Sequence, residues 1–367
     1  ALLAEKELFG DDYFYWKLYS SAQKLIQLSK EGKGESLLDP KASSLTFYEK
    51  GAWALHALKN EIGETAFKKA VKNYLLKYKF NTVETNNFLD EVAQVATFNR
   101  ERFETNWLVN KGFPEEAISQ LAASSHFITK LIEVENAIDI KIDDAKKILT
   151  SDMFYPLKQS IIAKINTLPM EEKIELLKTV FNSNDIEVRQ AISKNLDSIP
   201  QEIKPEFESL LEDKSYVTIE NALFALWKQF PHDRPKYLDA TKDFQGLNDK
   251  SLRMLWLTLA LVTEGYNPFE KPSYYKELSA YTGAENHFEQ RQNAFMFLYQ
   301  LQAFSDKNLE DLVLACQHPV WQFSKSSKEV LAELLRDNSY MSRFKEILPN
   351  LSKEAQDFLL TQLPKTH

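Results

Sequence analysis

The sequence predicts an all-α protein, and three observations lead to this prediction. Apolar residues recur three and four positions apart along most of the 367 residues, which places them on one face of a helix. Glycine is scarce, with 9 residues, and most of the 13 prolines fall between these periodic segments, where they separate helices. Strict alternation of apolar and polar residues, the pattern of a half-buried strand, does not extend over a convincing length. A β-sandwich is therefore not expected.

The first 114 residues are expected to form a block of four main helices. Gly63 ends the second of them, and Thr85 begins a polar segment that resembles the cap of the fourth. The two glycines of the loop 30–35 lack a third glycine and a preceding strand, so they indicate a turn and not a dinucleotide-binding fingerprint. Trp107 to Pro114 closes the block. The expected helices cover 12–29, 47–60, 67–78 and 88–95.

After Pro114 the sequence becomes repetitive. Helical segments of about a dozen residues alternate with short polar turns, and five of these segments carry a charged marker at a loosely regular interval. Because a single helix pair cannot bury its apolar stripe, such pairs stack on their neighbours. We expect a HEAT-like (ARM-type) helical-repeat domain over 115–367, with an irregular helical bundle as the alternative. The markers are Arg189, Glu220, Arg253, Arg291 and Lys325.

Composition and charge narrow the range of partners. The net charge of −8 argues against nucleic acid, which rewards a basic face, so no nucleic-acid partner is expected. No apolar run approaches the roughly 20 residues of a membrane span, so no transmembrane segment is expected. The single cysteine, Cys316, excludes an internal disulfide framework and a thiol-only zinc site, and its apolar neighbours indicate burial. The chain opens at Ala1 in a helical pattern, which suggests a piece of a longer protein and leaves its cellular location open.

Motifs read without reference to a family show no complete active site. There is no H-E-x-x-H motif, and no two histidines stand four residues apart, so none forms a zinc pair on one helix face. His56 would need ligands from other segments and is better explained as a partly buried structural histidine. The tryptophans and phenylalanines of the second block are expected to pack between helices. The histidines are His56, His126, His232, His287, His318 and His367.

Four groups of residues, in order along 1–115, carry a family resemblance. The groups are Leu8-Phe9-Gly10, then Tyr48-Glu49-Lys50-Gly51-Ala52, then Thr85-Asn86-Asn87-Phe88, and last Trp107 with Lys111-Gly112-Phe113-Pro114. Each group resembles a landmark of the aminopeptidase N and leukotriene hydrolase family of zinc metallopeptidases, the gluzincin aminopeptidases. The short tyrosine motif is weak by itself, whereas four landmarks at matching spacing are fairly specific.

The resemblance implies a fold and a role for Tyr48. Residues 1–114 would be the helical C-terminal part of a thermolysin-like catalytic domain, and 115–367 the helical domain that follows it directly in leukotriene hydrolase-like members. The family holds zinc with two His and one Glu and uses another Glu as general base. The tyrosine that matches Tyr48 donates a hydrogen bond to the tetrahedral oxyanion. Tyr48 is therefore the catalytic candidate.

The sequence departs from the family by what it lacks. The zinc motif, the third ligand and the segment that holds the substrate's amino terminus are absent from the 367 residues. The resemblance implies a parent enzyme that uses zinc to remove N-terminal residues from peptides. The chain itself is expected to bind no zinc and to be inactive, with the upstream half of its own catalytic domain as a partner. We also expect an exposed apolar surface near Tyr48.

Two further interpretations stay open. In the family's helical domain, basic residues can meet the C-terminal carboxylate of a peptide substrate, and Arg343 with Lys345 matches that role weakly. A solvated helix face explains the same two residues. For the whole chain, the alternative is a noncatalytic helical-repeat scaffold whose concave face binds a protein or peptide. The scaffold explains the repeats equally well, but it does not explain the landmarks around Tyr48.

Overall fold

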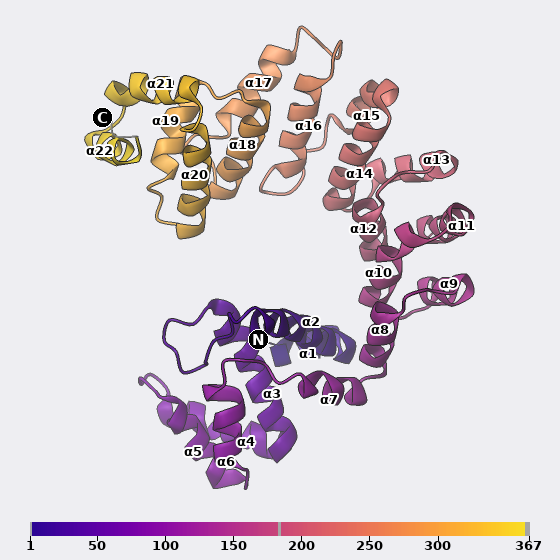
Figure 1. Ribbon diagram of the computed structural model, residues 1–367, viewed down its shortest axis with the longest axis vertical. Coiled ribbons are helices and arrows are strands. Elements are labelled where there is room, and N and C mark those ends of the chain that lie inside the picture. The colour runs from indigo at the N-terminus through magenta and orange to yellow at the C-terminus, as the bar shows by residue number, and fades with distance from the viewer. Residues whose placement is uncertain (1, 183–184, 364–367) are drawn as a thin grey trace. The chain divides into compact units, whose positions relative to one another are not determined.

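The computed structural model describes residues 2–182 and 185–363 (Figure 1). Within these residues the chain forms 22 α-helices and no strand, so the predicted all-α class is confirmed. The chain divides into two compact units, Ala1–Ile161 and Ile162–His367. None of the helices in the described part of the chain is both long and apolar enough to cross a membrane.

The first unit contains the four main helices expected from the sequence, together with shorter ones. Two π-helical turns, Thr46–Lys50 and Glu104–Val109, interrupt the α-helical path. Gly63 has φ +83°, a conformation that glycine adopts without strain, and it separates α3 from α4. The helices of this unit are α1 (Leu2–Phe9), α2 (Asp11–Lys30), α3 (Gly51–Ile62), α4 (Glu64–Tyr78), α5 (Thr85–Val95), α6 (Arg100–Phe103), α7 (Glu116–Ser124), α8 (His126–Asn136), α9 (Ile142–Thr150) and α10 (Tyr155–Ala163), which continues past the boundary.

Trp53 is the centre of the core beneath α3. Its indole is 2% exposed, and Nε1 donates to the carbonyl oxygen of Leu18 on α2 at 3.0 Å. Trp107 stacks on it with 6.4 Å between ring centroids, and Phe113 meets it edge-on at 5.3 Å. Such aromatic pairs add stability beyond the area they bury. The sequence landmarks at 107 and 113 thus fix the end of the block onto α2 and α3.

Helices beyond residue 114 also pack on α2. The hydroxyl of Tyr19 donates to Glu135 on α8 at 2.6 Å, and Trp16 lies edge-on to Phe154 and Tyr155 near the start of α10. These contacts explain why the first compact unit extends to residue 161. The expected boundary between 114 and 115 concerns the division implied by the family resemblance, and it stays a prediction.

The second unit is built from alternating helices. Helix α14 packs against α12 and α16, and α18 packs against α16 and α20, with the shorter intervening helices beside them (Figure 1). Its helices are α11 (Met170–Phe181), α12 (Ile186–Asn195), α13 (Lys204–Glu208), α14 (Tyr216–Gln229), α15 (Arg234–Thr241), α16 (Ser251–Val262), α17 (Lys271–Ala280), α18 (Phe288–Leu301), α19 (Asp306–Ala315), α20 (Trp321–Leu334), α21 (Asn338–Ile347) and α22 (Lys353–Gln362).

Hydrogen bonds tie neighbouring helix pairs of this unit at a nearly constant interval. Partners stand 29 to 31 residues apart in several successive positions. Two of the charged markers make equivalent ion pairs, because Arg189 binds Asp213 and Arg253 binds Glu277, each 24 residues further on. This regularity supports stacked pairs, and assignment to HEAT-like repeats stays a prediction. The bonded pairs are Ile199 with Gln229, Glu208 with Tyr237, Glu220 with Ser251 and Thr282 with Asp311.

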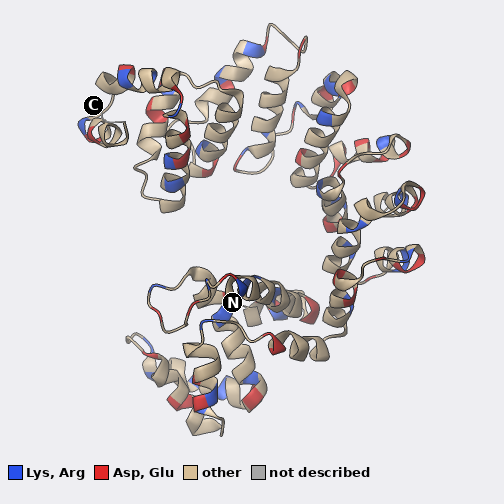
Figure 2. Cartoon of the chain, viewed as in Figure 1, with Lys and Arg blue, Asp and Glu red and all other residues tan. Residues whose placement is uncertain are grey.

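Most of the expected burial in the second unit is found, with one exception. Cys316 and Phe323 are fully buried, and Trp256 is 3% exposed. The expectation that Trp321 packs between helices is wrong, because its side chain is 68% exposed. Trp321 is the first residue of α20, where a side chain can point away from the neighbouring helices. Lysines, arginines and acidic residues are intermixed along the ribbons of both units (Figure 2).

Candidate functional site

Tyr48 lies in the middle of the π-helical turn Thr46–Lys50, immediately before α3. Single π-helical turns are frequent at functional sites. The Tyr48 side chain is 77% exposed and stands at the edge of a hollow of about 530 Å³. Apolar side chains from several elements line this hollow with it. They include Leu37, Phe47, Leu55, Phe88 and Leu108. The phenol is therefore presented to whatever occupies the hollow.

The base of the turn is held by a buried lysine. Lys50 is 2% exposed, and its ammonium donates to the carbonyl oxygens of Glu35 at 2.8 Å and Asn110 at 2.5 Å. Burial lowers the pKa of Lys50 to about 8, and the charge of Glu35 opposes that shift. One ammonium thus joins the end of the π-helical turn to two loops that lie 15 and 60 residues away in the sequence.

The carboxylate of Glu35 fixes the first residue of the same turn. It accepts hydrogen bonds from the Ser43 hydroxyl at 2.6 Å, from the Ser43 amide at 2.8 Å and from the Thr46 hydroxyl at 2.6 Å. These hydrogen bonds, from the Ser43 side chain first, lower the pKa of Glu35. The loop before the turn is closed on itself by this carboxylate and leads directly into Thr46.

The loop that carries Glu35 also packs against the end of the block. The Ser36 hydroxyl and the Leu37 amide donate to the carbonyl oxygen of Leu108 at 2.8 and 3.0 Å. Gly34 approaches the backbone so closely that a Cβ atom there would lie 2.3 Å from the carbonyl oxygen of Lys111. Only glycine fits this position. The residues around Tyr48 therefore rest on a rigid base.

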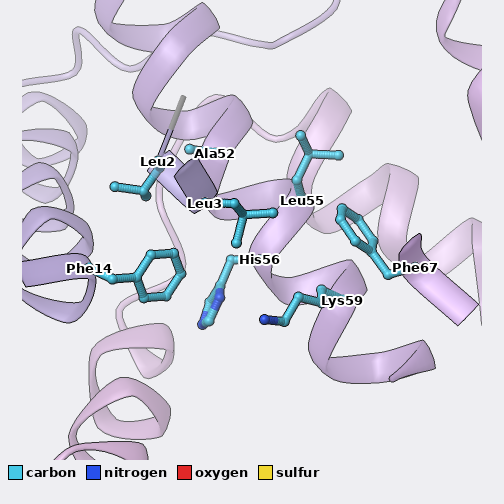
Figure 3. Close-up of a pocket in the computed structure, with 8 residues that line it drawn as sticks. All are labelled: Leu2, Leu3, Phe14, Ala52, Leu55, His56, Lys59 and Phe67. Carbon is cyan, nitrogen blue, oxygen red and sulfur yellow. The ribbon is translucent and has the colours of Figure 1, made fainter. Parts of the chain in front are cut away.

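His56 lies on α3, eight residues after Tyr48, beside a small pocket of about 170 Å³ (Figure 3). Its ring lies edge-on to Phe14 at 5.6 Å and to Trp53 at 5.8 Å. Nε2 lies 3.1 Å from the amide nitrogen of Asn60, while buried Nδ1 has no hydrogen-bond partner in the described structure. Burial, followed by the charges of Lys59 and Lys6, lowers the pKa of His56 to about 4. His56 is thus partly buried against aromatic rings, as expected for a structural histidine.

The depressed pKa of His56 predicts a loss of stability in mild acid. The unfolded chain takes up a proton on this histidine near pH 6.5, whereas the folded chain does so only near pH 4. The free energy of unfolding should therefore fall as the pH drops from 6.5 towards 4, and His56→Phe should remove that part of the slope. Urea unfolding at pH 7, 5.5 and 4.5, followed by tryptophan fluorescence, measures it. If wild type and His56→Phe lost the same free energy of unfolding between pH 7 and pH 4.5, the prediction would be contradicted.

The described residues do not form a zinc site. No group of three or more His, Cys, Asp or Glu side chains is placed to hold a metal ion in 2–182 and 185–363. Cys316 is buried, and burial raises the pKa of its thiol to about 12, so a thiolate ligand is disfavoured. His367 lies outside the described residues.

Arg343 and Lys345, the weak candidates for binding a substrate carboxylate, lie on α21 in the second unit. The Arg343 guanidinium binds Asp306 through Nε at 2.9 Å and Nη2 at 2.6 Å, and it lies 5.4 Å from the ring centroid of Tyr340. Lys345 is exposed on the same helix. A substrate carboxylate would have to compete with Asp306 for Arg343, and the assigned role stays a prediction.

Comparison with known proteins gives the family of the segment around Tyr48. Residues 38–107 match the family model described as the peptidase family M1 domain. The matched stretch includes the π-helical turn, α3, α4, α5 and Trp107, so the family resemblance of this segment is confirmed. Members of this family are zinc aminopeptidases. No solved structure matches the chain.

Proposed function

We propose that this chain is part of a zinc aminopeptidase that removes N-terminal residues from peptides. In this proposal residues 1–114 belong to the catalytic domain, and 115–367 form a HEAT-like domain that follows it in the chain. The observation that carries it is the exposed phenol of Tyr48 on a fixed turn inside the stretch that matches the peptidase family.

Tyr48 would act on the charge that develops during peptide hydrolysis. Attack on the scissile carbonyl produces a tetrahedral oxyanion, and a phenol is neutral at pH 7 and donates one strong hydrogen bond. A donor that is already in place needs no reorganisation when that charge appears. In the family, bound zinc activates the attacking water and polarises the carbonyl. Since the described residues offer no ligand set, the proposal assigns the ligands to a part of the catalytic domain outside this chain.

The exposed apolar side chains around Tyr48 support the proposal that a partner covers this surface. Large apolar side chains of α1, of the loop before the turn, of the turn itself and of α3 are exposed, and an exposed apolar patch of unusual size marks an interaction surface. We propose that the upstream half of the same catalytic domain covers it, and that the chain alone is inactive. The exposed side chains are Leu3, Leu8, Phe9, Leu38, Phe47 and Leu55, with exposed fractions from 42% to 75%.

The test compares this chain with the product of the complete reading frame that encodes it. We expect the complete product to bind one zinc ion and to hydrolyse aminoacyl para-nitroanilides, and residues 1–367 alone to do neither. Elemental analysis after dialysis gives the zinc content, and release of nitroaniline gives the turnover. A complete product without zinc and without turnover would overturn the proposal.

A hollow in the second unit favours the scaffold as a second candidate. It has a volume of about 790 Å³ over α12, α14, α16 and α18, and it combines exposed aromatic with amide side chains. Phe224, 49% exposed, is the aromatic residue that a bound peptide would cover. If the scaffold interpretation holds, a peptide that binds the chain should lose affinity on Phe224→Ala, and the complete product should show no peptidase activity. The other lining residues include Asn221, Gln229 and Phe297.

A further inference from the structure

Lys50 is an unusual lysine, because its ammonium is buried and makes no ion pair among the described residues. Both of its hydrogen-bond acceptors among the described residues are neutral carbonyl oxygens, and the Glu35 carboxylate acts on it only through its charge. Burying an ammonium is unfavourable unless it is well satisfied by hydrogen bonds. A lysine carries a compact charge with three donors on a flexible stem, which suits it to joining carbonyls from separate loops.

Glu35 holds both ends of the turn that carries Tyr48. Its carboxylate binds the hydroxyl of Thr46, the first residue of the turn, and its carbonyl oxygen binds the ammonium of Lys50, the last. Thr46 and Lys50 are both 2% exposed, whereas Tyr48 between them is 77% exposed. The turn is therefore clamped at its two buried ends, and its middle side chain faces solvent.

We propose that Lys50 is a positioning residue, which together with Glu35 clamps the turn so that the Tyr48 hydroxyl is held where the oxyanion forms. This inference rests on the proposed role of Tyr48. An oxyanion donor is effective only at 2.7–3.1 Å from the developing charge, and a displacement of about 1 Å can reduce the rate about 10²-fold. A turn released at Lys50 would let the phenol move by that order of distance.

The test is a double-mutant cycle in the product of the complete reading frame. Lys50→Met keeps the length of the side chain and removes the donor. We expect kcat to fall about 10- to 100-fold with KM and zinc content unchanged. In the Tyr48→Phe background the same substitution should lower kcat by no more than about twofold, because the hydroxyl that it positions is already gone. Thr46→Val loosens the other end of the clamp and should give a smaller, equally non-additive loss.

A second buried lysine supplies the matched control. Lys173 in α11 is 5% exposed, and its ammonium donates to Asn166 Oδ1 at 3.2 Å. Lys173→Met should lower the midpoint of thermal unfolding while kcat stays within about twofold of wild type. This control separates loss of a buried ammonium from loss of the clamp.

The outcomes separate this inference from the proposed function. If Tyr48→Phe retains full turnover, the proposed role of Tyr48 fails, and the clamp has nothing to position. Two results with an impaired Tyr48→Phe enzyme would overturn the clamp alone. One is that Lys50→Met lowers kcat by the same factor in the Tyr48→Phe background as in wild type, and the other is that Lys50→Met does not lower kcat at all. Should Lys50→Met fail to fold, the Thr46→Val cycle decides in the same way, since a multiplicative loss or no loss there would overturn the clamp.

Discussion

Tyr48→Phe is expected to lower kcat of the zinc-loaded complete enzyme by about 10²–10³, the typical effect of removing one oxyanion donor. The substitution removes a hydroxyl and keeps the ring. Because Tyr48 is 77% exposed and its hydroxyl has no hydrogen bond to the described residues, the fold loses nothing by the change. Since the hydrogen bond strengthens only in the transition state, KM should stay near its wild-type value. Steady-state kinetics with an aminoacyl para-nitroanilide measures both parameters.

Two measurements accompany the Tyr48→Phe assay. The zinc content must equal that of wild type, so that loss of turnover is not loss of metal. Tyr216→Phe is the matched control, because it removes a phenol hydroxyl from a 40% exposed side chain in the second unit and should leave kcat unchanged. A Tyr48→Phe enzyme within tenfold of wild type in kcat would remove Tyr48 from the proposed mechanism.

The elements around the site could be predicted from local sequence patterns. Apolar spacing predicted helices at 12–29 and 67–78, and the structure has α2 at Asp11–Lys30 and α4 at Glu64–Tyr78. Helix formation follows from residues three and four apart, so a short window of sequence contains the information. Tyr48 was identified by its place in an ordered set of landmarks, and the matching family segment includes it.

The clamp that Lys50 and Glu35 form on the turn could not be predicted in the same way. The sequence places Lys50 in the tyrosine motif, but nothing local shows that its ammonium is buried or that it reaches Asn110, 60 residues away. Glu35 lies in a loop without periodicity, where its role depends on how the loop closes. The available signal was the spacing of Lys50, which stands three and four residues before Trp53 and Ala54 on the apolar side of the helix. A lysine on that side needs buried acceptors.

The limit of the first compact unit also could not be predicted from the sequence. The pattern changes at Pro114, and that change suggested a domain boundary. The compact unit nevertheless extends to Ile161, because Trp16 and Tyr19 on α2 contact residues of α8 and α10. Contacts between segments more than a hundred residues apart leave no periodic trace in either segment. A change of pattern along the chain therefore marks a change of local architecture and not the limit of packing.

A buried polar network in the second unit predicts the largest stability effect. Asp311 on α19 is 3% exposed, and its carboxylate accepts from the Thr282 hydroxyl at 2.9 Å and from Lys307 at 2.7 Å. Arg291 on α18 is 4% exposed and donates to the carbonyl oxygens of Thr282 and Asp311. Burial lowers the pKa of Arg291, and the charge of Asp311 opposes that shift. The Asp311 carboxylate binds Thr282 and Lys307, whereas Arg291 is held by backbone carbonyl oxygens.

Asp311→Ala should lower the free energy of unfolding of the helices around α19 by about 1.5–3 kcal/mol, the usual contribution of hydrogen bonds to a charged group, because it removes the buried acceptor of Thr282 and Lys307. Asp306→Ala, on the same helix, is the control. It breaks the exposed pair with Arg343, in which the side chains are 62% and 31% exposed, and should change that free energy by about 0–1 kcal/mol. Amide hydrogen exchange of α18 and α19 measures the local free energy of opening without requiring the two units to unfold together. If Asp311→Ala changed exchange no more than Asp306→Ala, the network would be a by-product of helix packing, and Arg291 would be stabilised by its carbonyl acceptors alone.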